Sequence, residues 1–279
     1  MEEAFDYELD TAPFDVIVGE DIFAFIYTTA PQAIRSRVVK ALEHLTKAEA
    51  LRGVDDEMGA IRLIAGEEEL VVAIFEWLKL QSDHFPEHAD FVKQFKKHPV
   101  KQSFYPVLMQ FRWVLADLLG ADFIVDGLDE ATSWTAMPVL EERGVRLSIR
   151  DEQGNELIRH DPLSIAISRP DLKDDEVADA LFDTFAERVS QQGMTVPDFV
   201  RQRADFRNQI LYASDEGTVS MKDTLGELLS VFQETYRDLL WTLAVLVGGK
   251  PPSKEWGVVV QFFRVYRRVL VESGLIKAA

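Results

Sequence analysis

Apolar residues recur at helical spacing along most of this chain. Ile34, Val38, Leu42 and Leu45 stand four and three residues apart after Pro31, a residue suited to the first turn of a helix. Similar stripes mark helices at 61–80, 104–119, 174–192, 196–212, 225–247 and 256–272. A helix with one apolar face buries it against another element, so the sequence predicts a mainly α fold. We expect the stripes at 34–45, 61–78, 104–119 and 225–247 to share the core of one helical bundle.

Local signals set the boundaries of these predicted helices. Gly53 precedes an acidic run at 55–57, which indicates a break and a new start, because carboxylates favour the positive end of a helix. Gly193 ends one helix and Thr195 opens the next. The segment 104–119 is so apolar that we expect a buried helix there.

A short β element interrupts the helical pattern. Residues 145–150 alternate with period two, residues 151–155 have turn composition, and residues 156–159 can return as a second strand of a β-hairpin. We therefore predict four regions along the chain. They are an acidic N-terminal lead-in (1–32), the first part of a helical bundle (33–119), an insert with a hairpin and a helix (120–195), and the second part of the bundle with a C-terminal helix (196–279).

Composition excludes several kinds of site. The chain has no cysteine, which rules out disulfides, thiolate nucleophiles and cysteine-bound zinc. Its formal net charge of −18 favours solubility and repels polyanions away from a local basic patch. The first basic residue is Arg35, and no apolar run approaches the roughly 20 residues that span a bilayer. We expect a cytoplasmic protein with no membrane partner.

Residues 84–88 match the letters H-x-x-E-H of some zinc peptidases. Those enzymes need both histidines on one face of a helix, and Pro86 disfavours a helix at this point. We therefore expect no bound zinc and no other cofactor. A metal-dependent enzyme that uses His84, His88 and His98 is kept as a third alternative among the functions discussed below.

Three consecutive acids, Glu67, Glu68 and Glu69, stand inside an otherwise apolar helix. Adjacent side chains on a helix point about 100° apart, so the three cannot all avoid the buried stripe. At least one is expected to reach a partly buried position, where it needs a basic partner. The structural interpretation is an ion pair, and the functional one is a carboxylate of a binding or catalytic site.

Basic residues gather in three places in this acidic chain. We interpret them chiefly as partners for the excess of acids, with phosphate binding as the alternative. The three clusters are Lys93, Lys96, Lys97, His98 and Lys101; Arg201, Arg203 and Arg207; and Arg264, Arg267 and Arg268.

The segment 207–212, with the sequence RNQILY, combines a guanidinium, an amide and a phenol within about two helical turns. The guanidinium of Arg207 can hold a phosphate through two parallel hydrogen bonds. The phenol of Tyr212 can orient such a phosphate or transfer a proton to it.

These residues resemble the HEPN superfamily of helical bundle proteins, whose ribonuclease signature is Arg-Asn followed shortly by His. Tyr212 stands where that His falls. The string AGEEEL at 65–70 resembles a motif of the abortive-infection V branch, which then has a lysine where this chain has Val72 or Ala73. The string FVKQFKKH at 91–98 and the string LYASDEG at 211–217 resemble two further motifs of that branch. The resemblance covers 33–112 and 200–247.

The resemblance implies a function in phage defence or a toxin-like role, acting on RNA or the translation apparatus as a homodimer. Arg207 would grip the scissile phosphate and Tyr212 would act as acid or base. Asn208, Glu68, Glu69, His98 and Lys101 would line the substrate site.

Cleavage is expected to be weak or absent, because an unperturbed Tyr transfers protons poorly at neutral pH and the lysine is missing. Long apolar stretches at 241–247 and 256–271 predict a dimer interface. The rival interpretation is a non-catalytic helical module that binds a protein partner and in which the same residues form a buried polar network.

Overall fold

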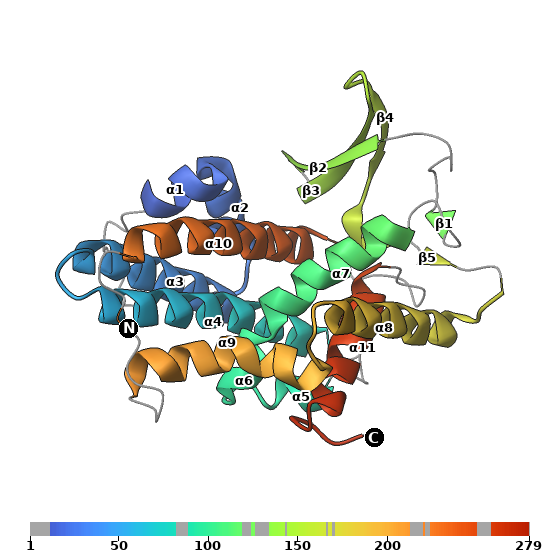
Figure 1. Ribbon diagram of the computed structural model, residues 1–279. Helices are drawn as coiled ribbons and strands as arrows, with labels where there is room; N and C mark the ends of the chain where they lie inside the picture. Colours follow the sequence, from blue (N-terminus) through green and yellow to red (C-terminus); the bar gives the residue numbers. More distant parts are fainter. Residues whose placement is uncertain are drawn as a thin grey trace.

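A computed structural model describes residues 12–81, 89–118, 124–125, 134–142, 144–165, 167–168, 171–212, 220, 224–249 and 258–278. The described chain is mainly helical and carries a small antiparallel sheet, which confirms the predicted fold class (Figure 1). None of the described helices is long and apolar enough to cross a membrane.

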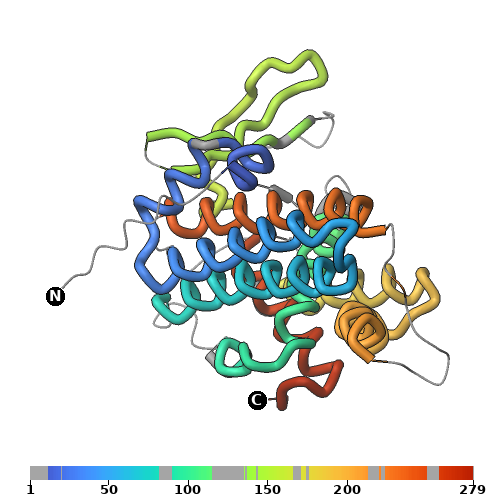
Figure 2. Tube along the Cα trace, turned by 90° about the vertical axis from the view of Figure 1, so that its left-hand side faces the viewer, coloured from blue at the N-terminus to red at the C-terminus, as the bar shows by residue number. Residues whose placement is uncertain are grey.

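Three long helices form the centre of the bundle. They are α3 (Gln32–Leu51), α4 (Asp56–Leu80) and α10 (Leu225–Gly248), and α4 packs against both of the others (Figure 2). Gly53, with φ of +71°, makes the turn between α3 and α4. The Asp55 carboxylate then accepts the backbone N–H of Met58 and caps α4. The predicted break and helix start are therefore confirmed.

The N-terminal lead-in contributes to the core, a role that its sequence did not indicate. Helices α1 (Ala12–Val18) and α2 (Glu20–Thr29) lie on α10, and Phe14, Ile22 and Ile26 are buried there. The apolar stripe of α3 is also buried, as predicted for Ile34, Val38, Leu42 and Leu45.

A second group of helices packs on the other side of α4. It comprises α5 (Ala89–Val92), α6 (His98–Gln102), α7 (Phe104–Leu118), α8 (Asp174–Gln191), α9 (Val196–Leu211) and α11 (Val258–Glu272). Its centre is an aromatic cluster in which the ring of Tyr266 contacts Phe75, Phe91, Phe104 and Phe262.

The four stripes expected to share one core do belong to one continuous core. The helix that was expected to be buried is α7, of which Phe104, Val107, Phe111 and Val114 are buried, whereas Trp113 is 55% exposed.

The sheet near the middle of the chain is larger than the predicted hairpin. The hairpin itself is confirmed as β3 (Gly144–Asp151) and β4 (Glu156–His160), and β2 (Trp134–Glu141) adds a third antiparallel strand beside β3. A separate pair joins β1 (Ile124–Val125) to β5 (Ile167–Ser168), and a short 3-10 turn, η2 (Pro162–Ser164), follows β4. Gly144 lies against Gly248 and so brings the sheet onto the end of α10.

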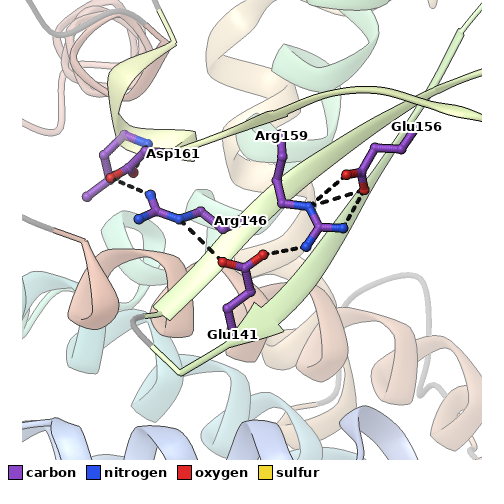
Figure 3. Close-up of polar contacts among 6 residues, drawn as sticks. Glu141, Arg146, Glu156, Arg159 and Asp161 are labelled. Atoms are coloured by element: carbon purple, nitrogen blue, oxygen red, sulfur yellow. Dashed lines mark hydrogen bonds and ion pairs between the residues drawn. The ribbon is translucent and has the colours of Figure 1, made fainter.

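Charged side chains cover one part of this sheet in an alternating network (Figure 3). Arg159 bridges Glu141 and Glu156, each at 2.5 Å, and Arg146 contacts Asp161 at 2.9 Å. Hydrogen bonds from Arg159 and Ser148 hold the pKa of Glu156 below its ordinary value. Because acids and bases alternate, the network stabilises the three strands and leaves little net charge for an external ligand.

Gly66 permits the close packing of α4 on α10 next to the three glutamates. A Cβ at this position would lie 1.8 Å from the hydroxyl of Tyr236, which is fully buried and donates to the carbonyl of Leu63 at 2.9 Å. A methyl group there would have to displace a ring that the core holds on all sides.

We predict that Gly66→Ala lowers the free energy of unfolding by about 1–3 kcal/mol, the range for overpacked cores. Gly226→Ala is the matched control, since its Cβ would meet only the guanidinium end of Arg52, at 2.9 Å. That variant should be neutral or stabilising by up to ~1 kcal/mol. Urea denaturation measures both values, and equal effects of the two substitutions would contradict the account.

Candidate functional site

The three glutamates of α4 bind three different elements. Glu67 binds a residue of α9, Glu68 binds residues of α6, and Glu69 binds Arg37 of α3 at 2.9 Å. The sequence prediction that at least one would be partly buried and paired with a base is confirmed. Glu67 and Glu68 are both buried, and both face the region where α4, α6 and α9 pack together.

Glu67 forms an ion pair with Arg203. The side chain of Glu67 is 1% exposed, and its Oε2 lies 2.7 Å from Nη2 of Arg203. The guanidinium also lies over the ring of Phe232, 4.9 Å from its centroid. The other carboxylate oxygen, Oε1, receives no hydrogen bond from the described residues. Burial raises the pKa of Glu67 despite the opposing effect of Arg203.

Glu68 accepts hydrogen bonds from three side chains of the short helix α6. Its Oε1 lies 2.7 Å from Nδ1 of His98 and 2.7 Å from Nε2 of Gln102. Its Oε2 lies 2.5 Å from Nζ of Lys101 and 3.0 Å from the same His98 nitrogen. The carboxylate is therefore satisfied on both oxygens, which is what burial of such a group requires.

The predicted catalytic pair is not brought together. Arg207 is half-buried and makes no ion pair with any described residue, whereas Tyr212 is 66% exposed beyond the end of α9. The backbone N–H of Tyr212 donates to the carbonyl of Asn208, whose side chain is exposed. Within the described chain, no hydrogen bond joins the Tyr212 hydroxyl to Arg207.

Five of the eleven basic residues highlighted in the sequence form ion pairs with acids of the described chain, so the predicted acid partners are confirmed for these five. His98 and Lys101 pair with Glu68, and Arg203 pairs with Glu67. In α11, Arg267 pairs with Asp90, and Arg268 with Asp179 and Asp183.

Arg203, Glu67 and Gln102 are central to this cluster but were not among the predicted site residues. The helical period carried a usable signal for Arg203, because it stands one turn before Arg207 and so shares its face of α9. Gln102 is fully buried and carried no signal, since its role depends on how α6 docks against α4.

Within the described chain, no cluster of acidic and histidine side chains is suited to holding a metal ion. His84 and His88 lie outside the described residues, and His98 is held by Glu68.

Comparisons with models of protein families, with curated proteins and with solved structures find no match for this chain.

We predict a pH dependence of stability that arises from Glu67. Because its folded pKa lies above the ordinary 4.5, the folded state keeps this proton longer than the unfolded chain. The free energy of unfolding should therefore fall as pH rises from about 4.5 through the folded pKa. Glu67→Gln removes this titration. The free energy of unfolding, measured by denaturation at a series of pH values, should therefore fall less steeply with pH in the variant.

Glu43→Gln is the control of opposite sign. A hydrogen bond from Lys40 lowers the pKa of Glu43, so this group stabilises the fold above its ordinary pKa and loses that contribution as pH falls. The contribution should be small, since the side chain is 42% exposed. A pH profile of Glu67→Gln that runs parallel to the wild type would contradict the assignment.

Proposed function

We propose that this chain is a HEPN-like protein that binds RNA on the face shared by α6 and α9 and cleaves it weakly or not at all. The observation that carries the proposal is Arg207. It lies one helical turn after the paired Arg203, on a helix that packs against α6, and it has no acidic partner among the described residues. A guanidinium in this position is available to an external phosphate.

The charge balance around Arg207 supports an anionic ligand. The acids on this side of α4 are already occupied, since Glu67 holds Arg203 and Glu68 holds Lys101 and His98. Lys93 and Lys96 are exposed on the segment that leads into α6. The chain repels polyanions overall, so a small basic patch limits binding to a short stretch of backbone.

Weak cleavage follows from the position of Tyr212. A phenol must be brought close to a cation before it can transfer a proton at neutral pH, and Tyr212 is exposed, with no hydrogen bond to Arg207. Within the described residues, the phenol that replaces the superfamily histidine thus has no cationic partner. The wider role in phage defence or a toxin-like system rests on the resemblance alone.

The second candidate is the protein-binding module. The observation in its favour is that the polar cluster is buried and largely neutral, which is typical of a network that fixes helix packing. The two candidates differ at Arg207, which a purely structural network does not need.

We also propose a homodimer, as the resemblance implies. Residues 241–247 and 258–271 are buried or partly buried against the chain's own core, so they offer little free apolar surface. Light scattering at micromolar concentration should give twice the mass of one chain, and a monomer at every concentration would refute the dimer.

The RNA-binding function predicts a specific effect of Arg207→Ala on a fluorescent single-stranded oligoribonucleotide followed by anisotropy. Loss of one phosphate contact should weaken binding by about tenfold, whatever the sequence of the RNA. It should also reduce the slope of log affinity against log salt concentration by about one. The control is Arg237→Ala, which removes an exposed arginine of α10 whose ion pair within the described residues is with the neighbouring Asp238.

Unchanged affinity in Arg207→Ala, or a wild type that binds no RNA, would contradict the proposal and favour the protein-binding module. Robust cleavage by wild type that Tyr212→Phe abolishes would contradict the view that Tyr212 lacks activation.

A further inference from the structure

His98 is the solvent-facing member of the polar cluster between α4 and α6. Its side chain is 48% exposed, whereas those of Glu68 and Lys101 are 8% and 12% exposed. Nδ1 of His98 lies within hydrogen-bond distance of both carboxylate oxygens of Glu68, at 2.7 and 3.0 Å. The imidazole is thus fixed on one edge by a buried carboxylate, and its other edge reaches solvent.

This arrangement determines what the ring can do. A carboxylate that accepts the Nδ1 proton holds a neutral histidine in the tautomer whose Nε2 carries a lone pair. Nε2 lies on the edge opposite Nδ1 and is therefore directed away from Glu68. In other carboxylate–histidine pairs, the carboxylate orients the ring while the second nitrogen accepts a proton from the reacting group.

Glu68 is itself held in place, so it can orient the ring. Lys101 and Gln102 each donate to the carboxylate, at 2.5 and 2.7 Å, and Gln102 is fully buried. Both come from the helix that begins with His98, so α6 and the carboxylate form one fixed unit.

The surroundings of His98 suit a phosphodiester. Lys96 and Lys97 precede it on the exposed surface, where Nζ of Lys97 also donates to the carbonyl of Leu275 at 2.9 Å, and α6 packs against α9, which carries Arg207. A strand of RNA held by these cations would pass the half-exposed imidazole. Tyr212, which occupies the position of the superfamily histidine in sequence, is 66% exposed and has no comparable side-chain partner among the described residues.

Resting on the RNA-binding function above, we propose that His98 is the general base of a slow RNA transesterification and that Glu68 is its positioning residue. Nε2 takes the proton of a ribose 2′-hydroxyl, the 2′-oxygen bonds to the adjacent phosphorus, and the bond from phosphorus to the 5′-oxygen breaks. The leaving oxygen takes a proton from water, and the imidazolium returns its proton to the hydroxide. The products are a 2′,3′-cyclic phosphate and a 5′-hydroxyl, with no other reactant consumed.

The test uses the full chain and a fluorescent single-stranded oligoribonucleotide, with mass spectrometry of the products. His98→Ala should lower the cleavage rate by ~10²–10⁴, and added imidazole should restore part of it. Glu68→Gln should lower the rate by ~10–100-fold, and RNA affinity should persist in both variants. Anisotropy measures affinity, and circular dichroism verifies the fold.

Lys47→Ala is the control, because Lys47 is exposed on α3 and pairs with Glu43 of its own helix. It should cleave like the wild type. RNA binding without cleavage, cleavage that survives His98→Ala, or a folded His98→Ala protein that imidazole does not restore would overturn the role of His98 and leave RNA binding standing. Failure of the wild type to bind RNA would overturn both.

Discussion

The burial of two adjacent carboxylates on α4 is the constraint on which the rest of the site depends. Glu67 and Glu68 point in different directions from one helix, and each requires a base because an unpaired buried carboxylate is strongly destabilising. Glu67 thereby fixes α9 through Arg203, and Glu68 fixes α6 through His98, Lys101 and Gln102. Because each buried carboxylate needs a basic partner, the two ion pairs place α6 and α9 on the same side of α4.

Arg207 and His98 differ from the neighbouring cations in the ion pairs that they form. The acids neutralise Arg203 and Lys101, which then serve as structural cations. Arg207 remains without an acid among the described residues, and His98 keeps one edge in solvent. We propose that this division leaves a face that holds a phosphate beside an oriented imidazole.

Periodicity and turn chemistry predicted most of the helices, because a buried stripe and a capping residue are properties of short stretches of sequence. Asp55 and Thr195 cap the helices that they were expected to open. Strand β2 escaped prediction since its sequence lacks clear alternation, and its pairing with β3 is a contact between segments. The packing of α1 and α2 on α10 was missed for the same reason.

The site was predictable only in part. The run of three acids on an apolar helix predicted buried ion pairs, and the structure contains them. Their partners could not be predicted, because they stand 30 to 136 positions away in the sequence. Spacing within one helix suggested that Arg207 and Tyr212 act together, whereas the end of α9 leaves Tyr212 in solvent. Gln102 and the Glu68–His98 pair depend on helix docking, which no local pattern encodes.

The central claim is that α6 and α9 form one phosphate-binding face. A crystal structure with a dinucleotide that lacks the attacking 2′-hydroxyl, and therefore cannot react, tests it most directly. The account predicts the bridging phosphate on the guanidinium of Arg207, with the position of the missing hydroxyl facing Nε2 of His98. A dinucleotide bound elsewhere on the chain, or a phosphate that contacts neither residue, would contradict it.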